Sequence, residues 1–305
     1  MTKRMKVVVV GSVALDSVET PKGRRKKMQG GSASYASLAS ALFAPTGLVG
    51  VVGKDFPKAY MKVYRAAALD LTGLQQVEGK TFHWDGTYEA NMNNRRTNRT
   101  ELNVFADFKP ILPAAYGRVP YLCLGNISPD LQALVLSQMK GRPFIMLDTM
   151  EMWIENSRKK LMSVISKVDL LTVNEHEARA LTGEESLFAA ARAILKMGPK
   201  YALVKKGEHG ALVMSRNRRD PFLVPAWPLE NVVDPTGAGD SFAGALAGAL
   251  AEHGDRVTWE SMCEAMVTAT AVASCTCGAF GIDGLAGLKR RALLARVNRF
   301  RTMLP

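Results

Sequence analysis

Short runs of β-branched and other apolar residues alternate with helix-length amphipathic stretches along most of the chain. Strands are expected over residues 7–14, 47–53, 119–126, 143–149, 169–174, 201–207 and 210–215. Helices are expected over residues 32–43, 58–69, 130–139, 158–168, 175–182 and 186–196, with one more after Asp240 and a final helical pair. Such alternation requires crossover connections, so it predicts an α/β fold with a mostly parallel sheet covered by helices on both faces. Ligands of such a sheet bind at the carboxyl ends of its strands.

Residues 80–105 interrupt this alternation. They contain Asp85-Gly86, which predicts a hairpin turn between a strand near Trp84 and a second strand beginning at Thr87. Together with residues 12–29, whose tip is polar, this antiparallel flap is expected to form a small β-lid over the active edge of the sheet. An ordinary surface hairpin has the same pattern, and the sequence does not separate the two.

The composition indicates one globular unit. The 305 residues are 47% hydrophobic and 22% charged, which is enough apolar material to bury a core. With no evident linker, low-complexity tract or repeat, a single domain over residues 1–305 is expected, with the lid as an insertion. The longest apolar run near the N-terminus, Val7–Val10, is too short for a membrane span or a signal peptide, so a cytoplasmic protein is expected. The four cysteines follow no disulfide or zinc pattern and predict reduced, buried thiols.

A formal net charge of +12 raises the question of nucleic-acid binding. The basic clusters are scattered, carry no interleaved aromatic residues and match no nucleic-acid module. They occur at residues 24–27, 95–96, 158–160, 216–219 and 289–291. A solvated basic surface is therefore the favoured interpretation, with neither nucleic acid nor membrane as a partner.

The stretch VVDPTGAGDSFAGALAGAL, residues 232–250, places a glycine run directly before a helix of small residues. Its glycine spacing fits neither the Walker loop nor the dinucleotide fingerprint. The amides of Gly237, Ala238 and Gly239 can converge at the helix start, where the backbone favours an anion. Asp240 then lies in the first turn, as a general base beside a transferring phosphoryl group would. A purely structural helix start, with Asp240 complementing the helix dipole, explains the same residues.

Several motifs, in a fixed order, resemble those of the ribokinase-like, PfkB-type carbohydrate and nucleoside kinases. Asp234 to Asp240, DPTGAGD, is similar to the C-terminal signature of that family. The others are Gly11 to Asp16, Gly30-Gly31, the Asn174 to Glu177 element NEHE, and Lys206 to Gly210, KGEHG. The resemblance covers nearly the whole chain. It implies a three-layer α/β/α ribokinase-like fold with a mostly parallel central sheet and a small β-lid, and an ATP-dependent phosphotransferase with an alcohol group as acceptor.

The resemblance also implies roles for residues on the phosphate side. Asp240 would be the catalytic base, and Gly237, Ala238 and Gly239 would form the anion hole for the γ-phosphoryl group of ATP. Asn174 and Glu177 would act through Mg²⁺ and its waters. Gly207 and Gly210 would line the nucleotide site, with Lys206 or Lys205 near the phosphates. Asp234 would bind a monovalent cation, K⁺; its simpler role is to cap its turn.

On the acceptor side, the resemblance assigns sugar hydroxyl groups to Asp16 and close backbone approach to Gly30 and Gly31. Asn126, at the end of its strand, is a weaker candidate. The sequence departs from the family at Tyr35, where an asparagine is usual, so an aromatic ring either narrows the acceptor pocket or stacks on a flat group. A second departure is Asp148-Thr149-Met150 in place of Asp-Pro-Asn.

The interpretation is therefore an ATP-dependent kinase that phosphorylates a hydroxyl group of a small sugar. An adenosine-like nucleoside kinase is the alternative, and Tyr35 together with the aromatic lid favours it. A nucleotide or sugar sensor of the same fold is the non-enzymatic alternative. The exposed strands of the lid also suggest a homodimer formed through it.

Overall fold

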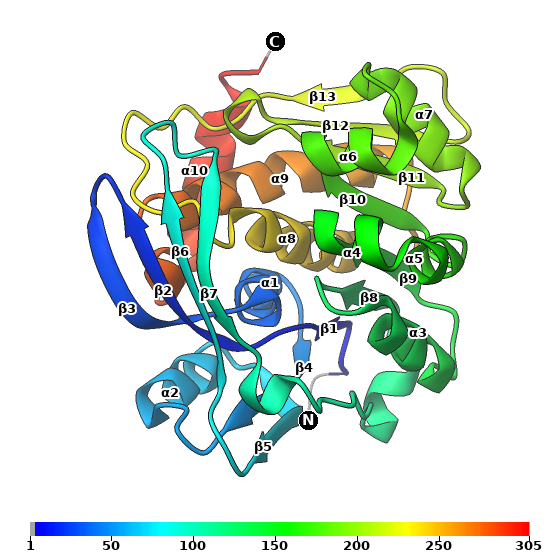
Figure 1. Ribbon diagram of the computed structural model, residues 1–305. Helices are drawn as coiled ribbons and strands as arrows, with labels where there is room; N and C mark the ends of the chain where they lie inside the picture. The colour runs from blue at the N-terminus through cyan, green and yellow to red at the C-terminus, as the bar shows by residue number, and fades with distance from the viewer. Residues whose placement is uncertain (1–3, 305) are drawn as a thin grey trace.

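The computed structural model describes residues 4–304 and places a nine-stranded sheet at the centre of the molecule, in the order β13-β12-β11-β10-β9-β8-β1-β4-β5 (Figure 1). The strands are β1 Val7–Val10, β4 Thr46–Gly53, β5 Asp70–Val77, β8 Tyr121–Leu124, β9 Phe144–Asp148, β10 Leu170–Asn174, β11 Tyr201–Lys205, β12 Ala211–Ser215 and β13 Phe222–Val224. All neighbours from β5 to β11 pair in parallel, and β12 and β13 add an antiparallel edge. The predicted mostly parallel sheet is confirmed.

Helices cover both faces of this sheet. They are α1 Ser32–Ala41, α2 Lys58–Ala66, α3 Pro129–Gln138, α4 Glu151–Asn156, α5 Arg158–Ile165, α6 Glu175–Thr182, α7 Leu187–Lys196, α8 Ala238–His253, α9 Trp259–Cys277 and α10 Arg290–Arg301. Short 3-10 turns are η1 Asn103–Phe105, η2 Ala114–Arg118, η3 Gly207–His209 and η4 Gly281–Gly284. One hydrophobic core joins α1, α2 and α8 to α10, and the other joins α3 to α7. In β1, Val7 and Val9 enter the first core while Val8 and Val10 enter the second, which explains the unbroken apolar run.

A separate four-stranded sheet, which we call the small sheet, has the order β3-β2-β6-β7 (Figure 1). Its strands are β2 Ala14–Thr20, β3 Gly23–Gly30, β6 Phe82–Tyr88 and β7 Arg95–Glu101. β2 pairs in parallel with β6, and the other two pairs are antiparallel.

The hairpin turn predicted at Asp85-Gly86 is wrong. β6 continues through both residues, with only a shift of its register against β7 at this point. Glycine is needed here for packing, because a Cβ on Gly86 would lie 2.2 Å from the Trp84 ring. The chain reverses instead between β6 and β7, where the Asn91 side chain accepts hydrogen bonds from the amides that follow it.

The four cysteines are free, but only Cys123 is buried; Cys263, Cys275 and Cys277 are half-buried. The expectation of buried thiols therefore holds for one of them. Within residues 4–304, no helix is long and apolar enough to cross a membrane.

Candidate active site

Three neighbouring strands end in polar side chains at one edge of the central sheet. Asp148, Asn174 and Lys205 are the last residues of β9, β10 and β11. Because these strands are parallel, their carboxyl ends lie side by side. Lys205 Nζ lies 3.0 Å from Asp148 Oδ1, and the two side chains are only 17% and 10% exposed. This edge, where parallel sheets bind their ligands, thus carries a largely buried ion pair.

The glycine run before α8 faces this ion pair. Gly237 is the N-cap of α8, with φ 76° and ψ 3° in the left-handed region. A Cβ on Gly237 would lie 2.4 Å from the Tyr35 ring, so both the backbone conformation and the packing require glycine. The Ala238 amide donates to the Pro235 carbonyl at 3.1 Å in the turn that starts the helix, whereas no such turn bond is made by the amides of Gly237 and Gly239 among the described residues. The anion hole at this helix start stays a prediction.

Asp240 lies half-buried in the first turn of α8. Burial and the Asp148 carboxylate raise the pKa of Asp240 to about 6, while Lys205 and Arg95 oppose the rise. At neutral pH the carboxylate is therefore mostly ionised, yet it is more basic than an ordinary aspartate. These are the properties of a general base that must accept a proton at neutral pH.

The structure distinguishes between the two lysines proposed for the phosphates. Lys205 points toward the start of α8, since a Cβ on Gly239 would lie 3.2 Å from its Nζ. Burial alone would lower the pKa of Lys205, but Asp148, Glu177 and Asp240 outweigh it and hold the pKa above its ordinary value. Lys206 is half-buried at the start of η3. Lys205 is thus the lysine that lies against the start of α8, and a place for Lys206 near the nucleotide stays a prediction.

Alternation along β11 could have indicated this. Leu203 belongs to the core shared with α8, and Lys205 lies two residues further along, on the same face of the strand. This alternation identifies Lys205 only when it is known which helix covers that face of β11.

Asp16 of β2 is 5% exposed and accepts a hydrogen bond from the Gly31 amide at 3.3 Å. Burial raises the pKa of Asp16 to about 7, although this hydrogen bond opposes the rise. The nearby carboxylates of Asp234 and Asp240 raise it further. Hydroxyl groups of an acceptor would replace the hydration that this carboxylate has lost.

Tyr35, in α1, lies between the two halves of the site. Its side chain is 1% exposed, and its hydroxyl group is buried without a hydrogen-bond partner among the described residues. Burial raises the pKa of Tyr35 well above its ordinary value, and the carboxylates of Asp16 and Asp234 raise it further, so the hydroxyl keeps its proton. Binding of an acceptor by this hydroxyl group stays a prediction.

The side chain of Asn126 is held by neighbours from the loop after β9 and from α4. Its Nδ2 donates to Met150 Sδ at 3.1 Å, and its Oδ1 accepts from Trp153 Nε1 at 2.9 Å. These contacts give Asn126 a packing role. Binding of an acceptor by Asn126 stays a prediction.

Asn174 and Glu177 form a capping box at the start of α6. Asn174 Oδ1 accepts from the Glu177 amide, and Glu177 Oε2 accepts from the Asn174 amide, both at 2.8 Å. Burial raises the pKa of Glu177 to about 7; Lys205 lowers it and Asp148 raises it. The structure thus shows directly that Asn174 and Glu177 cap the start of α6. The capping box uses Oε2 of Glu177 but not Oε1.

Asp234 caps its own turn, as the simpler interpretation predicts. It is fully buried, its Oδ1 accepts from the Thr236 amide at 2.9 Å, and its Oδ2 accepts from the Gly281 amide at 3.0 Å. Burial raises its pKa despite these hydrogen bonds. The carboxylate therefore fixes the loop that precedes α8.

The turn proposed for the nucleotide lies between β11 and β12. Gly207 and Gly210 have φ 53° and 82°, and the Lys206 amide donates to the Gly210 carbonyl at 2.7 Å. Asn93, at the tip of the β6–β7 hairpin, donates from Nδ2 to Glu208 Oε1 at 3.2 Å. The small sheet therefore touches this turn, a contact that the sequence did not predict.

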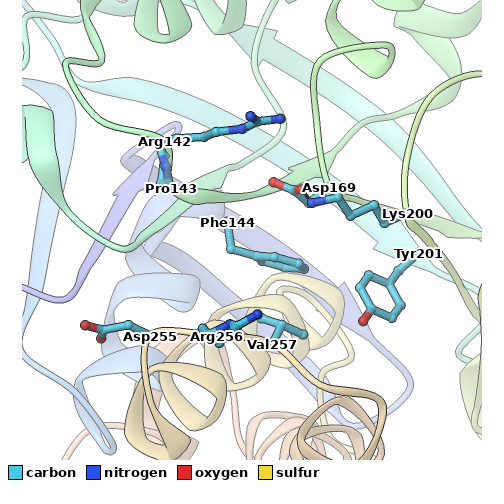
Figure 2. Close-up of a pocket in the computed structure, with 9 residues that line it drawn as sticks. All are labelled: Arg142, Pro143, Phe144, Asp169, Lys200, Tyr201, Asp255, Arg256 and Val257. Carbon is cyan, nitrogen blue, oxygen red and sulfur yellow. Dashed lines mark ion pairs between the residues drawn. The ribbon is translucent and has the colours of Figure 1, made fainter.

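A cavity of about 320 Å³ opens at the opposite edge, by the amino ends of β9 and β11 (Figure 2). Phe144 and Tyr201 line it, and its charged groups include Asp169, which is bound to Lys200 at 2.7 Å. Asp169 also accepts from a backbone amide of β9. The Asp169 carboxylate is thus paired with Lys200 and hydrogen-bonded to β9. None of the predicted site residues lines this cavity.

Comparison with known proteins finds relatives over most of the chain. The sequence pattern of the pfkB family carbohydrate kinases matches residues 4–284. The chain is 34% identical to the cytidine kinase of Thermococcus kodakarensis over 254 residues, 79% of this chain and 87% of that protein. A nucleoside kinase of Methanocaldococcus jannaschii superposes with a TM-score of 0.76 at 18% identity, over 97% and 99% of the two chains. A ribokinase II homologue of E. coli, solved with ATP and Mg²⁺, superposes with a TM-score of 0.78 at 20% identity, over 97% and 99%.

Proposed function

The chain belongs to the pfkB family of carbohydrate kinases, and from that membership we propose that Asp240 is its catalytic base and a nucleoside its acceptor. Its activity is ATP-dependent phosphotransfer to a hydroxyl group of a sugar or nucleoside. The observation that carries the assignment of Asp240 is its position in the first turn of α8, directly after Gly237 and Gly239 and beside Lys205. A base, an anion site and a fixed cation then meet where the phosphoryl group is transferred.

The nucleoside is supported by the cytidine kinase relative, which matches most of both chains. A small free sugar, the acceptor favoured by the sequence, is the second candidate because the family is described as one of carbohydrate kinases. In either case Asp16 would bind hydroxyl groups of the acceptor, Gly30 and Gly31 would let the backbone approach it, and the Tyr35 hydroxyl would hydrogen-bond to it.

In the proposed mechanism, Asp240 accepts the proton of the attacking hydroxyl group while the hydroxyl oxygen bonds to the γ-phosphorus of ATP and the bond from that phosphorus to the bridging oxygen of ADP breaks. The amides of Gly237 and Gly239 and the positive start of α8 stabilise the charge on the phosphoryl oxygens. Lys205, held in place by Asp148, adds a fixed positive charge. The small sheet would act as the lid, excluding water from the phosphoryl group.

Mg²⁺ fits the donor set at this edge. Within the described residues no group of three metal-ligating side chains occurs, so the protein alone offers no complete cage. A kinase site does not need one, because Mg²⁺ keeps much of its water and is held largely by substrate phosphates. Asn174 and Glu177 would hold its hydration shell, and the ion would supply positive charge to the phosphates. Gly207, Gly210 and Lys206 would border the nucleotide.

Several predictions made from the sequence remain to be tested. A K⁺ site near Asp234 is tested by comparing activity in potassium and tetramethylammonium salts. A homodimer through the small sheet is tested by sedimentation; its edge strands β3 and β7 are rich in arginine and lysine, which opposes pairing of two copies at low salt. The cytoplasmic location and the absence of nucleic-acid binding likewise stay predictions.

The test of the catalytic base is Asp240→Asn, with Asp255→Asn as a matched control at the opposite edge of the sheet. We expect Asp240→Asn to keep its melting temperature and ATP affinity but to lose phosphotransfer by about 10²–10⁴-fold. The control should retain full activity. Turnover by Asp240→Asn at the wild-type rate would exclude the assignment.

The acceptor is tested in a coupled assay of ADP formation over a panel of nucleosides and free pentoses and hexoses. The proposal expects the highest kcat/KM with a nucleoside. Preference for a free sugar would favour the second candidate instead.

A further inference from the structure

The β6–β7 hairpin presents two chemically different faces. Tyr88 pairs with Arg95 and Trp84 lies on the same face, since the Arg95 guanidinium is 5.5 Å from the centre of the Trp84 ring. Arg96 pairs with Thr87 and lies on the other face, because successive residues of a strand point to opposite sides. Adjacent arginines of β7 therefore point in opposite directions.

The face that carries Arg95 is turned toward the anion site. Tyr88 is 8% exposed, and its hydroxyl oxygen accepts a hydrogen bond from Thr236 Oγ1 at 3.2 Å. Thr236 directly precedes Gly237, the N-cap of α8. The pairing of Arg95 with Tyr88 thus places this arginine near the loop that would hold the phosphoryl group.

The charges around the site support this placement. Burial raises the pKa values of Asp16 and Asp240, on the acceptor and base sides of the site, and the guanidinium of Arg95 opposes both rises. Within residues 4–304, no carboxylate lies within ion-pair distance of Arg95. Lys205, in contrast, is committed to Asp148. The charge of Arg95 is therefore balanced by no described carboxylate, and its guanidinium packs over the Trp84 ring.

We propose that Arg95 is a catalytic residue carried by the small sheet, whose guanidinium binds the phosphoryl group as it passes from ATP to the acceptor. This role rests on the proposed function. In the transfer, the acceptor oxygen bonds to the γ-phosphorus, the bond from that phosphorus to the bridging oxygen of ADP breaks, and the hydroxyl proton moves to Asp240. Arg95 exchanges no proton and binds the non-bridging oxygens, to which its planar fork of N–H groups is complementary.

The tip of the same hairpin makes a second contact with the nucleotide side. Asn93, two residues before Arg95, donates to Glu208 in the turn between β11 and β12. The hairpin therefore contacts the loop before α8 through Tyr88 and the β11–β12 turn through Asn93. Arg95 follows Asn93 by two residues and pairs with Tyr88 across the hairpin.

The experiment compares Arg95→Ala and Arg95→Lys with Arg96→Ala, a neighbour of the same charge on the opposite face. We expect Arg95→Ala to lower kcat by about 10²–10³-fold, with the KM of the acceptor changed less than about fivefold and the melting temperature unchanged. Arg95→Lys should recover part of the loss because it keeps the charge but not the fork. Arg96→Ala should behave as the wild type.

Three outcomes would overturn this role: an unchanged kcat in Arg95→Ala, an equal loss in Arg96→Ala, or a rise confined to the KM of the acceptor. The last would place Arg95 on the acceptor instead. The wild type and Asp240→Asn are measured in the same assay. If the wild type transfers phosphate, Asp240→Asn abolishes the transfer and Arg95→Ala leaves it intact, only the role of Arg95 is refuted. If the wild type transfers phosphate to no acceptor, the proposed function is refuted as well.

Discussion

Replacing Gly237 by alanine adds one methyl group where the backbone enters α8. Its φ of 76° and ψ of 3° are left-handed, a conformation that costs a residue with a Cβ about 1 kcal/mol. The new Cβ would lie 2.4 Å from ring atoms of Tyr35, whereas packed carbon atoms lie about 3.5–4.0 Å apart. Because Tyr35 is itself buried, its ring has no free space to enter. The start of α8 must then move by about 1 Å to restore normal contact.

Gly183 provides a matched control. It is the C-cap of α6 with φ 76° and ψ 6°, and a Cβ there would meet nothing within 4 Å. Gly183→Ala should therefore show only the backbone cost and lower the free energy of unfolding by about 1 kcal/mol. Gly237→Ala adds overpacking of about 2 kcal/mol, for a total of about 3 kcal/mol. In a chain of this length the melting temperatures should fall by about 2 °C and about 5 °C.

The activities should differ more than the stabilities. A shift of about 1 Å in the amides of Gly237 and Gly239 should lower kcat by about 10²-fold, whereas Gly183→Ala should retain wild-type turnover. Scanning fluorimetry and the coupled assay measure both quantities on the same preparations. If the two variants matched in melting temperature and in turnover, the contact of Tyr35 with the helix start would not be what fixes the anion site.

Two further predictions concern the charges at this edge. Lys205→Met should destabilise the protein by about 2 kcal/mol, because it leaves the Asp148 carboxylate buried and unpaired, and should lower kcat by about 10²-fold. Adding Asp148→Asn should restore melting temperature but not turnover, and recovery of both would assign Lys205 a structural role only. The acid side of the pH profile of kcat/KM should fall about tenfold per pH unit below about 6, since protonated Asp240 cannot act as a base. Lys205→Met removes a positive charge that lowers the pKa of Asp240, so the decrease in kcat/KM should begin at a higher pH. A wild-type profile that is flat down to pH 5 would contradict the assignment of Asp240 as the base.

Local sequence signals predicted most elements of the central sheet and its helices. The boundaries of α6 agree with the prediction, because Asn174 and Glu177 give a capping box and Gly183 ends the helix. The hairpin prediction at Asp85-Gly86 was wrong because the sequence alone does not distinguish a glycine in a strand from a glycine in a turn. What identifies Gly86 as a strand residue is the Trp84 ring above it.

The sequence by itself determined the parallel α/β architecture, the helix start at Gly237 and Asp240 in its first turn, since all three follow from short-range patterns. Only the tertiary structure placed Lys205 against the start of α8, committed the Ala238 amide to a turn, placed Tyr35 against Gly237 and set Tyr88, the partner of Arg95, against Thr236. These outcomes depend on which face of a strand meets which helix or loop, and the contacts join residues up to about 200 positions apart. The spacing of residues in the sequence indicates whether a segment is a helix or a strand. Which distant residue each side chain contacts is fixed only when the helices and strands pack together.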